Sequence, residues 1–538
     1  MILIEKLKSE APRKTMALLL ALTTALGPTV VPAFAASEPV QKAAAAAATA
    51  TPIKHLVVIF QENVSFDHYF GTYPVATNPS GEPRFVAARG TPTVNGLSNA
   101  LLNFNPNLNP YNGFGASNPF RLDRSQVVTS DQDHDYLAEQ LAFDAGLMDL
   151  FPLNTGSGGA SIVMGYFDGN TVTALWNYAQ NFAMSDNSYG TTFGPSTPGV
   201  INLVSGQTNG VTATLNGTGD EVSGGSDNSL TVVGDPDPLG DVCSNPTRNQ
   251  VTMGSKNIGD LLSAAGVTWG SFMGGFNLST VNANGTTGCT RSSTGLAGVT
   301  NDYIPHHSFF NYYASTANLA HTRPASVAEI GNAGPANHQY DLQDFYAAAG
   351  AGNLPAVSFL KAQAYQDGHA GYSDPLDEQT FLVNTLNFLQ TLPSWRSTAV
   401  VVMYDDSDGW YDHQMGPIVN TSTGPADGLS GPGTCGIAAL SLPGLNPANT
   451  TALGRCGYGP RLPLLVISPW AKRNFVDNTV TDQTSIIRFV EDNWLGGTRI
   501  GNGSFDGIAS SISQMFDFQG QEHVRRLFLD PSTGEPQH

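Results

Sequence analysis

The sequence predicts an α/β fold, with a layered and mostly parallel sheet that is covered by helices on both faces. Four apolar runs rich in β-branched residues support this prediction: HLVVIF (55–60), PAVSFLK (355–361), TAVVVMY (398–404) and LPLLVIS (462–468). Nearly continuous apolar strands are typical of parallel sheets buried on both faces. Helical patterns lie between the runs, over residues 133–151, 377–389 and 485–494, the last with Asp482 or Thr484 as its expected cap. Such alternation indicates an α/β sheet.

The chain is long enough to bury a large core, because 41% of its 538 residues are hydrophobic. We expect residues 53–538 to form a single domain. Residues from about 205 to 300 differ in composition, being rich in Gly, Asn, Ser and Thr with short strand-like pieces such as LTVV. They are expected to be a loop-rich insertion that carries one disulfide.

The first 35 residues have the pattern of a secretion signal. A basic stretch precedes the apolar run MALLLALTTALG, and Ala33-Phe34-Ala35 fits the small-x-small cleavage pattern. The apolar run is too short for a stable membrane span. We therefore expect a secreted or periplasmic protein that is cleaved near Ala35, with the alanine-rich residues 36–52 as a tether. An uncleaved amphiphilic anchor is the alternative.

The charge and the cysteines agree with that location. The net charge of −20 repels phosphate backbones, so nucleic-acid binding is not expected. The four cysteines include no CxxC pair, which argues against a zinc or redox site and suits an oxidising compartment. Three pairings are possible. We favour the two local ones, Cys243 with Cys289 and Cys435 with Cys456, over free buried thiols.

Polar residues follow two of the predicted strands directly. Glu62 and Asn63 come after the first run, and Asp405 and Asp406 come after the third. Ligands in open α/β sheets bind outside the carboxyl ends of the strands, where these side chains are expected to converge. Carboxylate and amide oxygens are hard ligands that suit Mg²⁺, Ca²⁺ or Mn²⁺. The shared placement predicts a divalent metal site, against the alternative of two solvated turns.

The stretch FGPSTPGVINLVSG (193–206) predicts a helix with a hydroxyl group at its start. Thr197 is expected to cap this helix, Pro198 to occupy its first position and Gly206 to end it. Ser196 would then lie just ahead of a helix N-terminus, which favours an anion. Near a cation, its hydroxyl could attack phosphorus. The alternative is an ordinary Ser/Thr-Pro turn.

Four histidines lie among polar and glycine residues, as a site loop requires. They are His134, His306, His307 and His369. Together they could contact a phosphate and supply a general acid. Each taken singly is more often structural.

Several motifs in order resemble one known family. They are QENVSFDHYFG, DHDYLAEQLAFDAGLMDLF, GPSTPG, YDDSDGWYDH and RLPLLVISPWAKRNFVDNTVTDQTSIIRFVEDNW. Over residues 53–495 the chain resembles the phosphoesterase family of bacterial phospholipases C and AcpA-type acid phosphatases. The resemblance implies an alkaline-phosphatase-like α/β fold and metal-assisted hydrolysis of phosphate esters by one catalytic domain.

The resemblance also implies roles for the site residues. Glu62, Asn63, Asp405 and Asp406 match the metal ligands. Ser196 resembles the nucleophile that forms a phosphoryl-enzyme. His134, His306, His307 and His369 are similar to the histidines that bind phosphate and transfer protons.

The chain departs from many phospholipases C at two motifs. Those proteins have Thr and a Pro-Asn-Arg run where this chain has Ser196 and Pro198-Gly199, and Asp-Glu followed by Gly-Gly where it has Asp405-Asp406-Ser-Asp-Gly. Both differences resemble the acid phosphatase branch. We therefore expect a secreted metal-dependent phosphoric ester hydrolase that acts on phosphate monoesters. One alternative is a phospholipase C that cleaves phosphatidylcholine-type lipids to diacylglycerol and a phosphorylated headgroup. A remote alternative is an inactive secreted binding protein.

Overall fold

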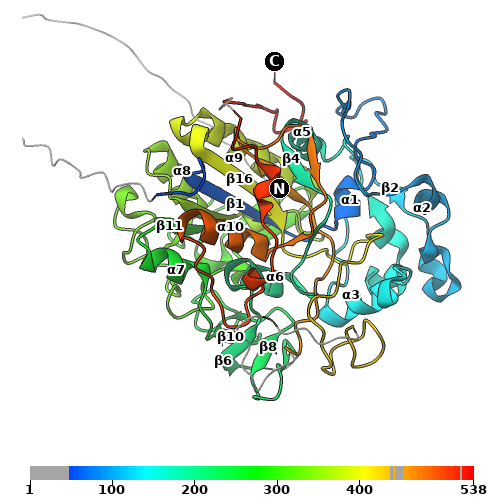
Figure 1. Ribbon diagram of the computed structural model, residues 1–538, viewed down its shortest axis with the longest axis horizontal. Coiled ribbons are helices and arrows are strands. Elements are labelled where there is room, and N and C mark those ends of the chain that lie inside the picture. The colour runs from blue at the N-terminus through cyan, green and yellow to red at the C-terminus, as the bar shows by residue number, and fades with distance from the viewer. Residues whose placement is uncertain (1–47, 218, 437–441, 443–451, 521–523, 538) are drawn as a thin grey trace, which may run out of the picture. The chain divides into compact units, whose positions relative to one another are not determined.

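Eight strands form the central sheet within the residues that the structure, a computed structural model, describes: 48–217, 219–436, 442, 452–520 and 524–537 (Figure 1). In spatial order they are β14 (Gln339–Asp341), β11 (Trp269–Met273), β15 (Val357–Lys361), β1 (His55–Gln61), β16 (Thr398–Tyr404), β17 (Leu464–Ile467), β4 (Ala183–Ser185) and β18 (Phe475–Asp477). The predicted signal peptide and most of the predicted tether lie outside the described residues.

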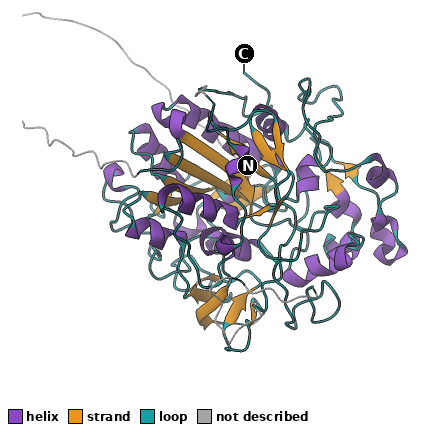
Figure 2. Cartoon of the chain, viewed as in Figure 1, coloured by secondary structure: helices purple, strands orange, loops and turns teal. Residues whose placement is uncertain are grey.

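The central sheet is covered on both faces. All residues of β16 are buried, as are all but the first of β1, and successive strand residues point to opposite faces. On the helical layers, α6 (Ser196–Ser205) packs against α7 (Ile258–Ala264) and α10 (Thr484–Trp494), and α5 (Thr173–Asn181) packs against α9 (Pro375–Thr391). Helix α8 (Leu342–Gly350) packs on β11 and β14. Helices surround the strands in Figure 2. The predicted α/β class with a mostly parallel sheet is confirmed.

One predicted strand runs against the others. Strands β14, β11, β15, β1 and β16 are mutually parallel, whereas β17 is antiparallel to both of its neighbours, β16 and β4. The run LPLLVIS gave no sign of this direction, because a strand buried on both faces has the same continuous apolar pattern in either orientation.

The expected insertion at 205–300 is only partly loop. Five short strands form a second sheet in the order β7 (Glu221–Ser223), β8 (Leu230–Val232), β6 (Asn209–Leu215), β10 (Gln250–Met253) and β9 (Asp237–Pro238). Strand β11, also within this range, belongs to the central sheet. Three two-stranded pairs complete the described strands: β2 (Phe120–Arg121) with β3 (Gly165–Tyr166), β5 (Ser188–Tyr189) with β19 (Thr481–Asp482), and β12 (Ser292–Gly295) with β13 (Gly298–Asn301).

The helical pattern over 133–151 is interrupted. It folds as α3 (Tyr136–Phe143) and α4 (Phe151–Asn154), because Asp144 and Ala145 adopt left-handed backbone conformations that end the first helix. The shorter helices α1 (Phe66–Phe70) and α2 (Asn99–Asn103) lie before it in the chain. The pattern over 377–389 lies inside α9, which Asp374 caps by accepting hydrogen bonds from two backbone N–H groups. Helix α10 starts at Thr484. Gln483, the residue before it, makes no capping hydrogen bond, but the side chain of Asp482 accepts from the N–H of Thr484 at 3.2 Å.

Both favoured disulfides are present. Cys243 is bonded to Cys289 and Cys435 to Cys456, so all four cysteines are paired. Each bond closes a local loop and restricts the unfolded chain. Within the described part of the chain, every helix is too short or too polar to span a bilayer.

The buried carboxyl group of Glu378 makes stability depend on pH. Tyr69 and Tyr404 donate hydroxyl hydrogen bonds to it (3.0 and 2.6 Å), and burial raises the pKa of Glu378 from 4.5 to about 8. Because the folded state holds this proton more tightly than the unfolded state, the stabilisation is complete below pH 4.5 and is lost as the pH rises through about 8.

Relative to Glu378→Gln, the wild-type protein should therefore lose several kcal/mol of unfolding free energy on going from about pH 5 to about pH 8.5, at about 1.4 kcal/mol per pH unit. Denaturant unfolding of both proteins at the two pH values measures this. An equal difference between them at both values would contradict the assigned burial effect.

Candidate active site

The predicted metal residues meet where β1 and β16 end. Gln61 pairs with Tyr404 in the parallel register, so Glu62 and Asp405 leave adjacent strands at the same level. Asn63 turns the chain with a φ of 60°, a left-handed conformation that asparagine tolerates better than most residues. The backbone N–H of Asn63 donates to Asp405 Oδ1 at 3.1 Å, which joins the two strand ends.

Ser196 lies against this pair of strand ends. Its Oγ donates to Glu62 Oε2 at 3.0 Å and to Asp406 Oδ2 at 3.2 Å. The inner atom of the Asn63 amide lies 2.8 Å from Glu62 Oε2 and 3.3 Å from Asp405 Oδ1. All of these side chains are buried. Ser196 thus links Glu62 to Asp406, and the Asn63 amide links Glu62 to Asp405, so these five side chains form one cluster.

The remaining oxygens of the cluster are held from the opposite side by Lys361, the last residue of β15. Its Nζ forms an ion pair with Glu62 Oε1 and another with Asp405 Oδ2, the second at 3.3 Å. His307 Nδ1 lies 3.2 Å from the same Glu62 oxygen. The backbone N–H of Asp408 donates to Asp406 Oδ1 at 2.7 Å. Glu62 and Asp406 thus each have one oxygen fixed by the protein and one turned toward Ser196, whereas Asp405 has Oδ1 bonded to backbone N–H groups and Oδ2 paired with Lys361.

The electrostatics of the cluster follow from its burial. Burial and the neighbouring Asp405 raise the pKa of Glu62 and of Asp406 well above the usual range. Burial also acts to raise the pKa of Asp405, but the charge of Lys361 and hydrogen bonds from Glu62, Asn63 and Asp406 together outweigh it and lower that pKa. Three acids with one buried ammonium leave an excess of negative charge in a site that excludes water.

This donor set fits a divalent cation. Without a cation, the Asn63 amide is best satisfied with its nitrogen toward Glu62 and Asp405 and its oxygen accepting from His369 Nε2 at 3.0 Å, whereas a cation among the carboxylates would favour the opposite orientation, with the amide oxygen inward. Glu62, Asn63, Asp405 and Asp406 would hold the ion, and their hard oxygen atoms suit Mg²⁺, Ca²⁺ or Mn²⁺. With Lys361 counted, one divalent ion would balance the three carboxylates.

Helix α6 starts two residues earlier than the sequence predicted. Ser196 is its first residue and Pro195 precedes it, so Thr197 is inside the helix and does not cap it. The backbone N–H of Thr197 is instead taken by Asp235 Oδ1 at 2.8 Å. The helix approaches the strand end so closely that a Cβ at Gly199 would lie 2.5 Å from the carbonyl oxygen of Asp405. Glycine at this position lets Ser196 reach the cluster.

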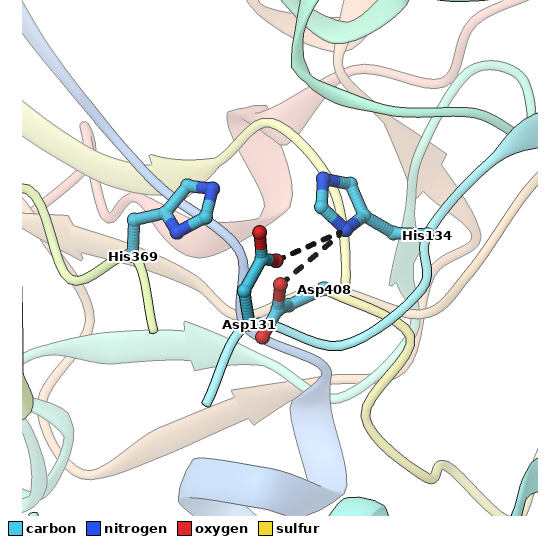
Figure 3. Close-up of side chains that lie close together, drawn as sticks. All are labelled: Asp131, His134, His369 and Asp408. Atoms are coloured by element: carbon cyan, nitrogen blue, oxygen red, sulfur yellow. Dashed lines mark ion pairs between the residues drawn. The ribbon is translucent and has the colours of Figure 1, made fainter. Parts of the chain in front are cut away.

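Two of the four predicted histidines lie beside Asn63. His134 Nε2 is 3.4 Å from Asn63 Nδ2, and His134 Nδ1 is 3.4 Å from Asp408 Oδ1 and 3.8 Å from Asp131 Oδ1 (Figure 3). Burial acts to lower the pKa of His134, but Asp406, Asp408 and Asp131 outweigh it and raise that pKa well above its usual value. His369 faces His134, with ring centroids 5.9 Å apart, and burial lowers the pKa of His369 to about 4.

The other two histidines lie on a 3₁₀ turn, Pro305–His307, that packs against α6. Their rings are in edge-to-face contact with centroids 4.6 Å apart. Burial lowers the pKa of His307 well below its usual value. His306 Nδ1 lies 3.5 Å from Asp237 Oδ1. All nine predicted site residues therefore belong to one neighbourhood, with His306 at its edge.

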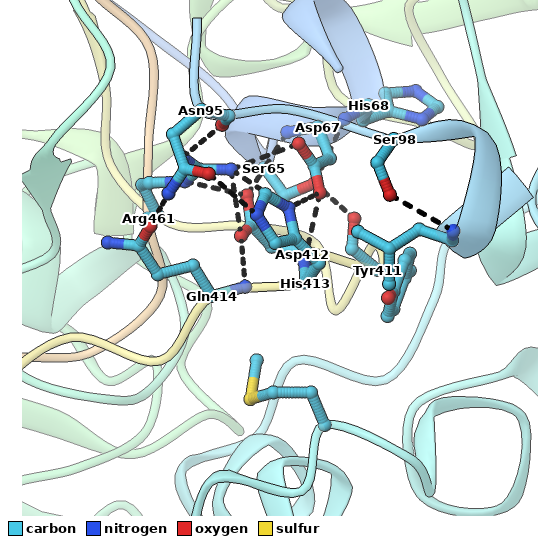
Figure 4. Close-up of polar contacts among 12 residues, drawn as sticks. Ser65, Asp67, His68, Asn95, Ser98, Tyr411, Asp412, His413, Gln414 and Arg461 are labelled. Atoms are coloured by element: carbon cyan, nitrogen blue, oxygen red, sulfur yellow. Dashed lines mark hydrogen bonds and ion pairs between the residues drawn. The ribbon is translucent and has the colours of Figure 1, made fainter. Parts of the chain in front are cut away.

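Two polar residues that follow Glu62 and Asn63 belong to a different network. Asp67 forms ion pairs with Arg461 (3.0 Å) and with His413 (2.6 Å), and Arg461 also pairs with Asp412 (Figure 4). His68 stacks on Trp410, with centroids 4.0 Å apart. These contacts hold the turn after β1 to the loop after β16 and supply no oxygen to the cluster.

Sequence reasoning missed several neighbours of the cluster. Lys361 also ends a strand, and the rule that selected Glu62 and Asp405 would have found it. Asp408 contacts His134 from within the stretch that supplied Asp405. Gln483, which had no predicted role, donates to the carbonyl oxygen of Asp405 at 2.6 Å. Only the fold reveals Gln483, because it approaches from a segment remote in sequence.

Replacing Lys361 should change the affinity for cations. In Lys361→Met the carboxylates lose their buried ammonium, which should destabilise the metal-free protein by about 3–5 kcal/mol and tighten divalent-ion binding. Thermal unfolding with and without Mn²⁺ measures both effects, and we expect a larger Mn²⁺-induced rise in Tm for the variant than for the wild type. Lys472→Met, which removes a lysine packed over the Phe475 ring, is the control. Equal rises in all three proteins would show that Lys361 does not compensate the cluster.

A serine hydroxyl among buried carboxylates at a helix N-terminus is a centre suited to phosphoryl transfer. The comparison with known families agrees. Residues 53–495 match the phosphoesterase family, and the chain belongs to it.

Relatives of the chain include bacterial phospholipases C. The hemolytic phospholipase C of Pseudomonas aeruginosa is 26% identical over 493 residues, which cover 88% of this chain and 57% of that protein. The non-hemolytic phospholipase C of Burkholderia pseudomallei is 25% identical, covering 82% and 55%. Phospholipase C A of Mycobacterium tuberculosis is 24% identical, covering 87% and 78%. The chain thus spans little more than half the length of the first two.

Solved structures with a similar arrangement include murine ectonucleotide pyrophosphatase/phosphodiesterase 5. It has a TM-score of 0.31 and 13% identity, covering 64% of this chain and 95% of that one. A protein of the alkaline phosphatase superfamily from Vibrio parahaemolyticus has a TM-score of 0.26 and 12% identity, covering 74% and 77%.

Proposed function

We propose that this chain is a metal-dependent phosphoric ester hydrolase that uses Ser196 as its nucleophile and acts on phosphate monoesters. The observation that carries the proposal is the position of Ser196 Oγ, 3.0 Å from Glu62 Oε2 and 3.2 Å from Asp406 Oδ2, in a member of the phosphoesterase family. A divalent ion held by Glu62, Asn63, Asp405 and Asp406 would acidify the hydroxyl and draw charge from the phosphoryl oxygens.

In the first step, Ser196 Oγ attacks phosphorus in line with the ester oxygen. The hydroxyl proton passes to one of the two carboxylates that Ser196 contacts. The phosphorus–ester bond breaks and the leaving alkoxide takes a proton from a histidine. His134 is the histidine of choice, because Asp408 and Asp131 flank its ring. The product of this step is an alcohol and a phosphoserine at position 196.

In the second step, water attacks the phosphoserine. His134, which lost its proton in the first step, accepts a proton from that water, and Ser196 Oγ recovers a proton as it leaves. Inorganic phosphate is released from a monoester. A diester would release the phosphorylated headgroup. The dipole of helix α6, whose first residue is Ser196, would favour the negative charge of the transferred group.

The second candidate substrate is a phospholipid. The names of the relatives favour it, since the hemolytic and non-hemolytic proteins and the mycobacterial one are all phospholipases C. The residues around Ser196 and after Asp406 favour the monoester. Under the phospholipase alternative, the chain cleaves phosphatidylcholine-type lipids to diacylglycerol and the phosphorylated headgroup.

Assays on p-nitrophenyl phosphate and on phosphatidylcholine, with and without a chelator, separate these candidates. We expect chelator-sensitive hydrolysis of p-nitrophenyl phosphate at the higher rate. Faster cleavage of phosphatidylcholine would favour the phospholipase. Hydrolysis of neither substrate would leave an inactive binding protein as the better account.

We also propose that the protein acts outside the cytoplasm. Two disulfides and the N-terminal pattern of basic, apolar and small residues support this location. N-terminal sequencing of the protein from culture supernatant or periplasm, with a start near residue 36, is the expected result.

A further inference from the structure

A long segment on the edge of the molecule carries no charge. Residues 90–120 contain no Asp, Glu, Lys, Arg or His, in a chain with a net charge of −20. The segment includes α2 and two 3₁₀ turns, Pro106–Leu108 and Pro110–Gly115. Helix α2 lies at the periphery of the view, away from the central sheet (Figure 1).

The usual relation between polarity and burial is reversed in this segment. Phe104 is 80% exposed, Tyr111 is 79% exposed and Phe114 is fully exposed. Asn107 and Asn112, which lie between them, are buried. Large apolar side chains are normally buried and asparagines are normally exposed, so three exposed aromatic residues within eleven positions need an explanation.

The buried asparagines fix the loop in this orientation. Asn107 Nδ2 donates to the carbonyl oxygen of Met148 at 2.8 Å, and its Oδ1 accepts from the N–H of Phe151 at 3.0 Å. Asn112 Nδ2 donates to the carbonyl oxygen of Asp149 at 2.8 Å, and its Oδ1 accepts from the N–H of Leu153 at 3.1 Å. Four side-chain hydrogen bonds thus tie the loop to residues 148–153, and the aromatic side chains face outward on a rigid support.

The support contributes further exposed apolar side chains. Leu147 and Leu153 lie at the two ends of the segment that binds Asn107 and Asn112, and they are 63% and 52% exposed. We define the apolar patch as Phe104, Leu108, Tyr111, Phe114, Leu147 and Leu153. A single exposed apolar residue is ordinary, whereas a group on adjoining segments marks an interaction surface.

The same support is connected to the active site. The N–H of Asp133 donates to the carbonyl oxygen of Thr155 at 2.8 Å, and the N–H of Ser157 donates to Gln132 Oε1 at 3.0 Å. Gln132 and Asp133 directly precede His134 in the chain. Thr155 and Ser157 follow α4, the helix that contains Leu153. The apolar patch and the histidine loop therefore belong to one continuous part of the structure.

We propose that the apolar patch docks the protein on a neutral, zwitterionic lipid–water interface. Aromatic and leucine side chains on a rigid loop suit insertion at the level of lipid headgroups. The uncharged segment offers no lysine or arginine to anionic lipids, and the acidic remainder of the chain opposes them. A second copy of the chain would bring two strongly negative molecules together, which their mutual repulsion disfavours.

Docking would bring phosphate esters carried by lipids close to the His134 loop. This consequence rests on the proposed function. The binding itself is independent of catalysis. Co-sedimentation with phosphatidylcholine vesicles therefore tests docking, and hydrolysis of the soluble p-nitrophenyl phosphate tests the proposed function, in separate assays.

The test uses the full-length Ser196→Ala protein, so that lipid hydrolysis does not alter the vesicles. We compare it with a variant that also carries Phe104→Ser, Tyr111→Ser and Phe114→Ser. Vesicle affinity should fall by at least about tenfold, because three exposed apolar side chains are lost. Val281→Ser with Val299→Ser, which removes two other exposed apolar side chains, is the control and should bind like the parent.

The three aromatic substitutions, placed in the protein that retains Ser196, should leave hydrolysis of p-nitrophenyl phosphate unchanged, which also shows that the fold is intact. Docking is overturned if the parent does not bind phosphatidylcholine vesicles, if binding requires anionic lipid, or if the variant binds equally well. Sedimentation velocity without lipid is run in parallel. If the protein is a dimer that the three substitutions dissociate, the partner of the apolar patch is a second copy of the chain and not a lipid.

Discussion

Replacing Ser196 by alanine is expected to reduce kcat for p-nitrophenyl phosphate by at least about a thousandfold, because the reaction loses its nucleophile. Ser196 Oγ is the only hydroxyl that the described residues place in hydrogen-bond contact with both Glu62 and Asp406. Its removal leaves the cation ligands in place, so divalent-ion binding, measured as a rise in Tm, should persist. Steady-state kinetics and thermal unfolding on the same preparations check both statements.

The matched control lies at the other end of the same helix. Ser205 Oγ donates to the carbonyl oxygen of Ile201 at 3.0 Å, as a helical serine commonly does. Ser205→Ala should change kcat by less than about tenfold, because it perturbs packing and not chemistry. Ser196→Thr keeps a hydroxyl and should retain part of the activity that Ser196→Ala loses. Near wild-type activity in Ser196→Ala would remove Ser196 from the mechanism.

The second large effect is expected for Asp406→Asn. The substitution removes one carboxylate from the cluster and one contact to Ser196. If a bound cation supplies several kcal/mol of transition-state stabilisation, at about 1.4 kcal/mol per tenfold, activity should fall by about a thousandfold or more. The variant should also lose the rise in Tm that Mn²⁺ gives the wild type, which distinguishes a lost ligand from a general loss of stability.

Asp477→Asn is the control for this change. Asp477 is also a buried aspartate at a strand end, but it ends β18 at the edge of the sheet and accepts from Thr479. The control should keep both its activity and its response to Mn²⁺. An Asp406→Asn protein that still gains Tm with Mn²⁺ as the wild type does would contradict the assignment of this ligand.

The convergence of Glu62, Asn63, Asp405 and Asp406 was predictable from the sequence because strand ends obey a simple rule. Parallel neighbours in one sheet end at the same edge, so residues that follow them meet whatever their separation in the chain. The pairing of Gln61 with Tyr404 is the register that this rule requires. The two local disulfides were predictable for another reason, since closing a short loop costs less chain entropy than closing a long one.

Other features depend on information that a local pattern does not contain. The direction of β17 is not encoded by its apolar run, and β11 lies within a stretch whose overall composition resembled a loop. The breakdown of the helix after Phe143 depends on the left-handed conformations of Asp144 and Ala145, which are residues that also occur in helices. Gln483 contacts Asp405 only because the fold brings a distant segment there.

The exposure of the apolar patch was also not predictable from the sequence pattern. Phe104, Tyr111 and Phe114 would be assigned to the core by hydrophobicity alone. Their exposure follows from the hydrogen bonds of Asn107 and Asn112, which bury the polar side of the loop. Burying an amide costs little free energy when all its hydrogen bonds are made and much more when they are not. Which case applies is known only once the hydrogen-bond partners are known.

If a phosphoryl group passes through Ser196, it can be trapped there as a covalent intermediate. The enzyme is mixed with p-nitrophenyl phosphate, quenched in acid during turnover and digested, and its peptides are analysed by mass spectrometry. Nucleophilic attack by Ser196 predicts phosphoserine at position 196 in the wild-type protein and none in Ser196→Ala. Turnover with the phosphoryl group on another residue, and with Ser196 unmodified, would contradict it.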